Sequence, residues 1–195
     1  LTHEIGADWQ VAAEDFKTAL TPLQEKDSLS SVLFQLPESF HYTKDNRIYL
    51  AKLIDEFEGF PVMVEFRHKE WIRESVFEGL EKRKAGIVFC DMPQLKNLPD
   101  GTVLGTPFIG SNAYIRMHGR NEGAWYTAGE SINGSARYCY DYSENELAQF
   151  VPIIKQAKRE GKKVQVYFNN HPNGSGAKNA ISLRKMIVMD ENGGK

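Results

Sequence analysis

Five short apolar segments of this sequence each end at polar side chains that could bind a ligand or transfer a proton. These side chains are Gln35; Glu65 and Arg67; Asp91; Arg116 and His118; and Asn169 and Asn170. Carboxylates and imidazoles can exchange protons or bind divalent metals, whereas guanidinium groups match phosphates and carboxylates. The spacing therefore predicts a single site where acids, bases and anion-binding groups meet.

Glu65, Asp91 and His118 are the candidate catalytic residues. His118 could act as a general acid or base, and the three side chains together could hold a divalent metal. The alternative is a network of structural ion pairs, with Glu65 beside Arg67 and Asp91 beside Arg116. Two arginines next to metal ligands would oppose the binding of a cation, so the sequence favours ion pairs over a metal site.

Three arginines, Arg67, Arg116 and Arg120, indicate an anionic ligand, because a guanidinium group binds phosphate or carboxylate through two parallel hydrogen bonds. A turn with the sequence Asn173-Gly174-Ser175-Gly176 precedes the last expected helix. Backbone N–H groups at such a helix start could bind phosphate. The alternative is an ordinary turn, with glycines for positive φ and a serine as helix cap.

A long segment from Gly119 to Tyr142 is rich in aromatic residues. It contains Trp125, Tyr126, Tyr138, Tyr140 and Tyr142. These side chains could stack on a sugar or base and close over a site. The alternative is that they only fold this long segment against the rest of the protein.

Alternating strands and helices should position these residues. Strands are expected at about 31–36, 62–66, 86–90, 113–117 and 164–169, and helices at about 8–20, 44–57, 69–83, 143–159 and 177–188. This order is typical of a parallel sheet. In such sheets the functional side chains lie beyond the carboxyl ends of the strands.

The alternation of side chains along the strands favours a barrel over an open sheet. One face of every expected strand is apolar, while the other is mixed and ends in the polar residues named above. A barrel of the TIM type has such an interior. The prediction is thus an α/β fold in which residues 1–195 form a single domain, the carboxyl-terminal part of a β/α barrel. About five of eight strand–helix units are present, so about three strands should be missing on the amino-terminal side.

The net charge, the lengths of the apolar segments and the cysteine spacing argue against several classes of protein. A net charge of −2 gives no electrostatic reason to expect nucleic-acid or membrane binding. The apolar segments are far shorter than the roughly 20 residues that cross a bilayer. Cys90 and Cys139 lack a metal or redox spacing, which favours buried thiols in the cytoplasm. The first residue is Leu1 rather than methionine, and we expect the chain to be a piece of a longer protein.

Several motifs in chain order resemble those of the YecE-like family. They are Gln35-Leu36-Pro37-Glu38-Ser39-Phe40; Glu65-Phe66-Arg67 with Trp71; Tyr114-Ile115-Arg116-Met117-His118-Gly119-Arg120-Asn121 with Trp125; and Phe168-Asn169-Asn170. The resemblance implies an eight-stranded barrel and a cytoplasmic protein. Family members also carry glycine–tryptophan and Asn-x-x-Phe-Tyr motifs before the equivalent of Thr2, and these are absent here. The resemblance implies no particular reaction, because no activity is established for the family.

The sequence therefore predicts an enzyme, a hydrolase or lyase, that acts on a small phosphorylated or carboxylated substrate. Arg67, Arg116 and Arg120 would hold the anion, and Gln35, Asn169, Asn170 and Trp125 would line the site with the glycine-rich turn. Metal-assisted hydrolysis is one form of this hypothesis, and no other cofactor is indicated. A non-catalytic ligand- or partner-binding barrel is the alternative, because neither Gly-x-Ser-x-Gly nor His-Glu-x-x-His occurs. Binding or processing of single-stranded nucleic acid is a third possibility, disfavoured by the acidic charge balance.

Overall fold

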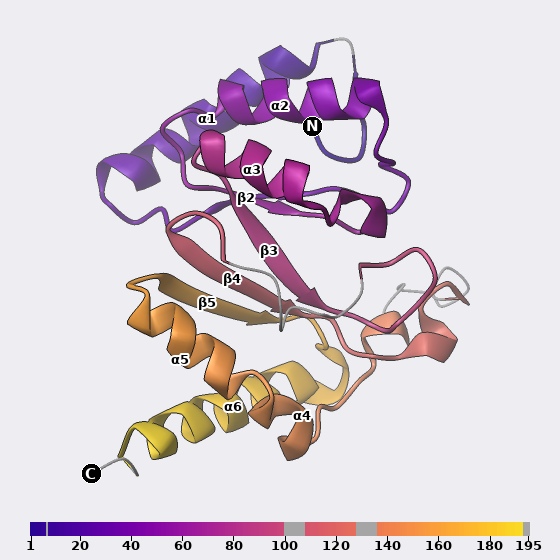
Figure 1. Cartoon of the computed structure of the whole chain (residues 1–195), viewed down its shortest axis with the longest axis vertical. Helices are drawn as coiled ribbons and strands as arrows, with labels where there is room; N and C mark the ends of the chain where they lie inside the picture. The colour runs from indigo at the N-terminus through magenta and orange to yellow at the C-terminus, as the bar shows by residue number, and fades with distance from the viewer. Residues whose placement is uncertain (7, 100–107, 128–135, 193–195) are drawn as a thin grey trace. The chain divides into compact units, whose positions relative to one another are not determined.

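The computed structural model describes residues 1–6, 8–99, 108–127 and 136–192 (Figure 1). Two compact units make up the chain. The first consists of Leu1–Val88 with Phe108–Asn112, and the second of Phe89–Pro107 with Ala113–Lys195. The sequence predicted a single domain; the two units are described separately below.

Five strands form a parallel sheet, as predicted. They are β1 (Val32–Gln35), β2 (Val62–Glu65), β3 (Gly86–Asp91), β4 (Asn112–Met117) and β5 (Lys163–Phe168), and they pair in chain order. The strand bounds agree with the expected ones to within a residue or two. The sheet is open rather than closed, because the pairing found among the described residues runs from β1 to β5 without a return to β1. A five-strand sheet lacks the strands that a closed eight-stranded barrel needs.

In the first unit, β1 and β2 pair in register, so that Gln35 lies opposite Glu65. This pairing confirms that the two polar side chains share one face of the sheet. Phe34 points to the other face, where its ring meets that of Phe57 edge to face at 5.0 Å. Helix α2 (Lys44–Glu56) follows β1, and the hydroxyl of Thr43 caps it by accepting a hydrogen bond from the backbone N–H of Asn46.

Helix α1 (Trp9–Glu25) is longer than the helix predicted at about 8–20. Val11 and Phe16, two of its apolar residues, are 63% and 38% exposed. The buried side chain is Ala13 instead, and Lys17, one turn further on, forms an ion pair with Glu56 of α2 at 2.6 Å. The apolar periodicity identified a helix, but the ion pair with α2 and the packing of Ala13 set its rotation.

The helix predicted at about 69–83 is divided into two pieces, the 3-10 turn η1 (Lys69–Trp71) and helix α3 (Glu74–Lys82). Trp71 causes the division, because its ring is buried between the rings of Phe40 and Phe66 and stacks on both. The extended backbone of Arg73 then starts α3 in a new direction. Figure 1 shows α2 and α3 beside one another.

In the second unit, the predicted helix from Ser143 is also divided, into α4 (Glu144–Ala148) and α5 (Val151–Arg159). A capping box starts α4, since the side chains of Ser143 and Glu146 each accept a hydrogen bond from the backbone N–H of the other residue. Pro152 explains the break, because a proline lacks an N–H and its ring clashes with the carbonyl four residues earlier. It lies in the first turn of α5, where proline is tolerated.

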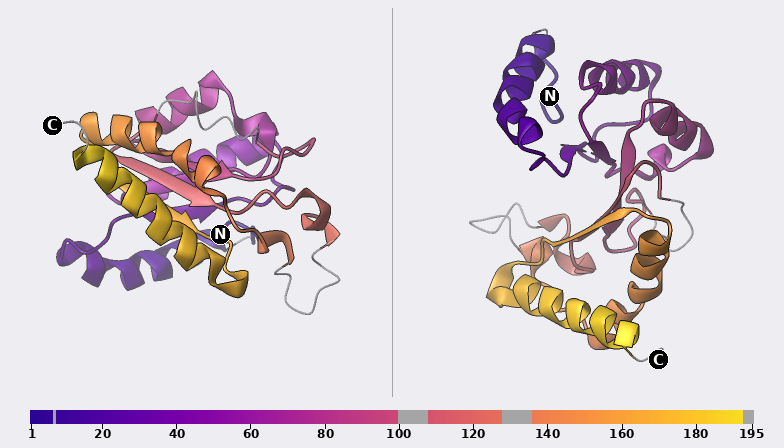
Figure 2. Two further views of the ribbon diagram at one scale, coloured as in Figure 1. Left: turned by 90° about the horizontal axis from the view of Figure 1, so that it is seen from below. Right: turned by 90° about the vertical axis from the view of Figure 1, so that its left-hand side faces the viewer.

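Helix α6 (Ser175–Asn192) packs against β5, α4 and α5 (Figure 2). The stacked rings of Tyr114 and Tyr167, 4.9 Å apart, confirm that these residues of β4 and β5 share a face. Strand β5 is less buried than expected, since Val166 and Phe168 are only half-buried and Tyr167 is 46% exposed. No helix among the described residues is long and apolar enough to span a membrane.

Candidate functional site

The carboxylate of Asp91, at the end of β3, is the centre of a polar group in the second unit. Asp91 is almost fully buried, and Arg120 holds both of its oxygens. The Arg120 Nε lies 3.1 and 2.9 Å from the two oxygens, and the Nη2 lies 2.8 Å from Oδ1. The ion-pair alternative named Arg116 as the partner of Asp91. The structure shows that Arg120, four residues later and beyond the end of β4, is a partner of Asp91.

Tyr142 completes the surroundings of this carboxylate. Its hydroxyl donates to Asp91 Oδ2 at 2.6 Å and accepts from the backbone N–H of Gly119 at 2.8 Å. Burial and the negative charge of Asp91 raise the pKa of Tyr142. A glycine is needed at position 119, where φ is +89° and a Cβ atom would lie 2.6 Å from that of Tyr140. The long aromatic segment is thereby fastened to the ends of β3 and β4.

Glu146 extends the group into helix α4. Its carboxylate accepts hydrogen bonds from the Tyr140 hydroxyl at 2.5 Å, from the backbone and hydroxyl of Ser143, and from Arg120 Nη1 at 3.4 Å. Although partial burial opposes ionisation, these bonds lower the pKa of Glu146. Burial and the bond to Glu146 raise the pKa of Tyr140 to about 12. We call Asp91, Arg120, Tyr140, Tyr142 and Glu146 the Asp91 cluster.

Glu146→Gln should weaken the acid dependence of stability. Because the folded-state pKa of Glu146 is lowered, its carboxylate stabilises the fold above the usual glutamate pKa of about 4.3. That contribution is lost as the pH falls through the folded-state pKa. Urea unfolding at neutral pH and at several values below about pH 4.3 should show a smaller loss in the variant. Glutamine keeps the capping box, so the helix start is preserved.

Glu144→Gln is the matched control, because Glu144 is an exposed acid in the same helical turn. Its stability should follow that of the unmodified protein at every pH. Indistinguishable acid profiles for Glu146→Gln and the unmodified protein would contradict the role given to Glu146.

His118, the expected general acid or base, is fully buried directly after β4. Its backbone N–H donates to the carbonyl oxygen of Asp91 at 2.9 Å, which fixes the ends of β3 and β4 side by side. The ring of His118 lies 6.1 Å from that of Tyr138, which in turn lies 6.4 Å from that of Trp125. Trp125 is buried, so at least this aromatic side chain folds against the protein, as the alternative for the long segment proposed.

The glycine-rich turn leads directly into helix α6. Helix α6 begins at Ser175, two residues earlier than expected, and both Ser175 and Gly176 are buried. A Cβ atom on Gly176 would lie 3.4 Å from the backbone and side-chain oxygens of Asn170. Gly174 has a φ of +72°, which agrees with the alternative of an ordinary turn.

The two asparagines after β5 have different surroundings. Asn170 is fully buried, and its Nδ2 donates to the carbonyl oxygen of Tyr140 at 2.9 Å and to Oδ1 of Asn179 at 2.7 Å. It therefore ties the aromatic segment to helix α6. Asn169 is half-buried, and its backbone N–H donates to the carbonyl oxygen of Met117 at the end of β4.

In the first unit, Glu65 and Arg67 form the predicted ion pair. The Nε of Arg67 donates to Glu65 Oε1 at 2.5 Å, and both side chains are buried. Gln35, on the neighbouring strand, lies 3.4 Å from the ring of His3. The metal alternative had combined Glu65 with Asp91 and His118. Within the units, the structure shows ion pairs of Glu65 with Arg67 and of Asp91 with Arg120.

A family model described as "Protein of unknown function DUF72" matches residues 1–193. The chain belongs to the DUF72 family. It is 30% identical over 183 residues to the UPF0759 protein YunF of Bacillus subtilis (strain 168). That match covers 91% of this chain and 64% of YunF, so the chain spans less than two thirds of the length of this relative.

Solved structures of two DUF72 proteins resemble this one. The DUF72 family protein of Thermotoga maritima MSB8 matches with a TM-score of 0.83 and 34% identity, over 96% of this chain and 70% of that one. A DUF72 family protein of Enterococcus faecalis V583 matches with a TM-score of 0.81 and 27% identity, over 92% of this chain and 66% of that one. These matches establish the family and its α/β fold.

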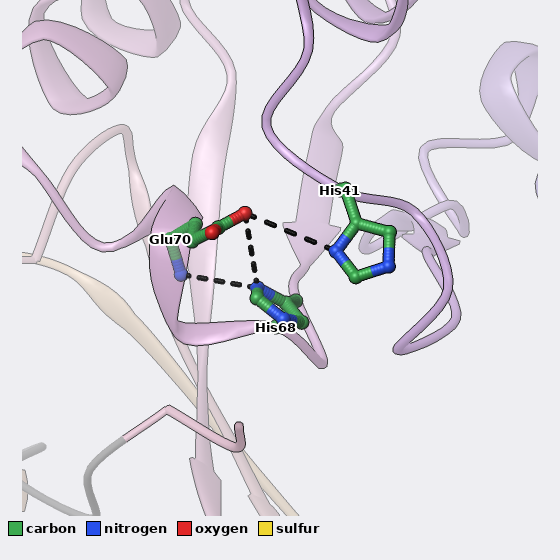
Figure 3. A group of neighbouring side chains, drawn as sticks. All are labelled: His41, His68 and Glu70. Atoms are coloured by element: carbon green, nitrogen blue, oxygen red, sulfur yellow. Dashed lines mark hydrogen bonds and ion pairs between the residues drawn. The ribbon is translucent and has the colours of Figure 1, made fainter. Parts of the chain in front are cut away.

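One group of side chains in this DUF72 chain that could bind a metal ion was not predicted from the sequence. His41, His68 and Glu70 lie together in the first unit, and Figure 3 shows contacts from the Glu70 carboxylate to both imidazole rings. His68 immediately follows the ion pair of Glu65 and Arg67, so its position just beyond β2 was a usable signal. His41 lies in the loop after β1, and no spacing in the sequence links it to His68.

The DUF72 chain also has a pocket of about 510 Å³ away from the strand ends, between α2 and α3. Tyr42, Trp71 and Arg83 are among the residues that line it. The guanidinium groups of Arg47 and Arg73 lie 5.0 and 4.0 Å from the centre of the Tyr42 ring. Both guanidinium groups therefore lie over the ring of Tyr42, which lines the pocket.

Proposed function

We propose that this DUF72 protein is an enzyme that acts on a small phosphorylated or carboxylated substrate at the carboxyl ends of its strands. The whole protein is proposed to be a cytoplasmic β/α barrel of the YecE-like type, in which these strand ends open into one mouth. The reaction is a hydrolysis or an elimination, and a divalent metal is a possible assistant to hydrolysis.

The way in which Asp91 holds Arg120 is the observation that carries this proposal. Nε and Nη2 of Arg120 are occupied by the buried carboxylate, which fixes the plane of the guanidinium group. Nη1 has one long contact, 3.4 Å to Glu146, and the side chain remains 31% exposed. An arginine held in this way can offer its free edge to an anion without losing further rotamer entropy.

Arginines at the strand ends of the second unit support an anionic ligand. Arg116 lies in β4, and Arg120 and Arg137 follow it. Arg137 lies 5.9 Å from the ring of Trp125, in the aromatic segment.

Other roles follow from the same placement. Arg116 and Arg120 bind the anion in this proposal, and Asn169 hydrogen-bonds the rest of the substrate. Asp91 acts as a positioning residue for Arg120 rather than as an acid or base, because its oxygens are engaged. Proton transfer is assigned to His118 or Glu65, and Glu65 is paired with Arg67 in the first unit.

Arg120→Gln should weaken the binding of a small anion at least about tenfold, since a hydrogen bond to a charged group contributes about 1.5 to 3 kcal/mol. Inorganic phosphate and oxalate are suitable probes, with dissociation constants measured by calorimetry or by changes in NMR spectra. Arg83→Gln is the matched control: Arg83 is 33% exposed and also pairs with an aspartate, Asp55, but on helix α3's surface. Equal affinities in the two variants would overturn the proposal.

A non-catalytic binding protein is the second candidate function. Two observations favour it: His118 is buried, and the carboxylate of Asp91 is buried and already accepts hydrogen bonds from the protein. Neither side chain is exposed to a substrate in this conformation. Incubation with a panel of phosphate monoesters and carboxylate esters distinguishes the two. Anion binding that depends on Arg120 without any turnover would favour the binding protein.

A further inference from the structure

We propose that His41, His68 and Glu70 form a binding site for a divalent transition-metal ion, with Zn²⁺ as the ion that fits best. Two imidazoles and one carboxylate are a donor set that zinc hydrolases and non-haem iron enzymes use, with open positions left for water or substrate. This inference does not rest on the proposed anion site.

The three donor atoms are already close to one another. Oε2 of Glu70 lies 3.5 Å from His68 Nδ1 and 3.9 Å from His41 Nδ1, and all three donor atoms lie within 4.8 Å of one another (Figure 3). Zinc bonds of about 2.0 to 2.1 Å in tetrahedral geometry place ligand atoms roughly 3.3 Å apart. The distance between Glu70 Oε2 and His68 Nδ1 is therefore already close to the separation that zinc requires. The larger movement falls on His41, whose side chain is 56% exposed and can turn about its χ angles.

The backbone positions of the three residues are fixed by a buried aromatic stack. Trp71 lies between Phe40 and Phe66, with ring centroids 5.2 and 4.9 Å away, and its indole N–H donates to the carbonyl oxygen of Phe40 at 2.6 Å. His41 follows Phe40, and Glu70 precedes Trp71 directly in the chain. The stack therefore holds the loop after β1 against the loop after β2, which keeps the donors of both loops together.

The hydrogen bonds show which atom of His68 would bind the ion. Nδ1 of His68 accepts a hydrogen bond from the backbone N–H of Glu70 at 3.3 Å. The lone pair of Nδ1 therefore points toward Glu70. This contact is long and would cost little to give up for a metal bond. His68 is buried, whereas the carboxylate of Glu70 is 48% exposed and can reach an ion from solvent.

The surrounding charges also permit a cation. Arg67, Lys69 and Arg73 are close to these residues in sequence. Arg67 is paired with Glu65, and Lys69 is exposed. The Nε of Arg73 donates to the carbonyl oxygen of Glu70 at 2.6 Å. Its guanidinium group stacks on Tyr42, 4.0 Å from the ring centre. The backbone N–H of Tyr42 donates to Glu70 Oε2 at 3.4 Å, which orients the carboxylate toward the two rings. The site lies beyond the carboxyl ends of β1 and β2, the end of a parallel sheet where ligands bind.

Titration of the chelator-treated protein with Zn²⁺ by calorimetry tests the proposal, together with the visible absorption spectrum of the Co²⁺-loaded protein. We expect one ion for each chain and a Co²⁺ spectrum typical of low coordination number with nitrogen ligands. His41→Ala and Glu70→Gln should each weaken binding more than about tenfold, the lower limit for loss of even a supporting group around a metal. Both side chains are exposed, so these variants are expected to stay folded.

His171→Ala and Glu74→Gln are the matched controls, since each removes one exposed imidazole or carboxylate outside the group. Both should bind Zn²⁺ as the unmodified protein does. Thermal unfolding with and without Zn²⁺ gives a second measurement, in which the metal raises the melting temperature of the unmodified protein and the controls only. Absence of Zn²⁺ binding, or equal binding by His41→Ala, Glu70→Gln and the controls, would overturn the proposal.

Discussion

Trp71→Ala is expected to lower the free energy of unfolding by about 3 to 5 kcal/mol, the usual cost of removing a buried aromatic side chain. Trp71 is 2% exposed and stacks on Phe40 and Phe66 with interplanar angles of 12° and 9°. Its removal leaves a cavity between these rings and an unsatisfied carbonyl oxygen at Phe40. Chemical denaturation measures the change.

Two further variants separate the causes of this loss. Trp71→Phe keeps much of the stack but removes the indole N–H, so it should cost only about 1 to 3 kcal/mol. Trp9→Ala is the control for an aromatic residue that is only half-buried, on helix α1, and it should cost less than Trp71→Ala. A stability for Trp71→Ala within 1 kcal/mol of the unmodified protein, about the cost of a typical single substitution, would show that the stack is not central.

Asp91→Ala should cost about 2 to 4 kcal/mol, because removing one member of a buried ion pair leaves its partners without compensation. Three hydrogen bonds from Arg120 and one from Tyr142 are lost together. The lower part of the range applies if Arg120 turns toward water, which its 31% exposure permits. The same variant should weaken anion binding, since Asp91 fixes the guanidinium plane.

Asp55→Ala is the matched control for Asp91→Ala. Asp55 also accepts from an arginine Nε, that of Arg83 at 2.7 Å, but its side chain is 58% exposed. Exposed pairs contribute about 0 to 1 kcal/mol, so this variant should be nearly as stable as the unmodified protein. Denaturation midpoints that fall equally in both variants would contradict the importance assigned to the Asp91 cluster.

Much of the fold could be predicted because local patterns determine it. The apolar segments gave all five strands, since a buried parallel strand needs a run of apolar side chains wherever it lies. Thr43 and Ser143 marked helix starts for an equally local reason, the unsatisfied N–H groups of the first turn. The ion pair of Glu65 and Arg67 could be predicted because the two residues are two positions apart at the end of β2, and residues two apart along a strand lie on the same face.

The errors in helix bounds came from contacts between distant residues. Helical periodicity continued through positions 69–83, but stacking of Trp71 on Phe40, 31 residues earlier, divides that segment. Likewise Val11 fits a buried helical face, yet the ion pair of Lys17 with Glu56 and the packing of Ala13 turn it to solvent. Periodicity shows that a helix is amphipathic; it does not show which neighbour will cover it.

By itself, the sequence determined the parallel α/β arrangement and the fact that acids, bases and arginines gather at the strand ends. Only the tertiary structure decided their partners. Asp91 pairs with Arg120 because the chain beyond β4 turns back at Gly119. His41 meets His68 and Glu70 only because an aromatic stack joins two loops. Side-chain identity limits which bonds are possible, whereas the folded path of the chain determines which atoms come within reach.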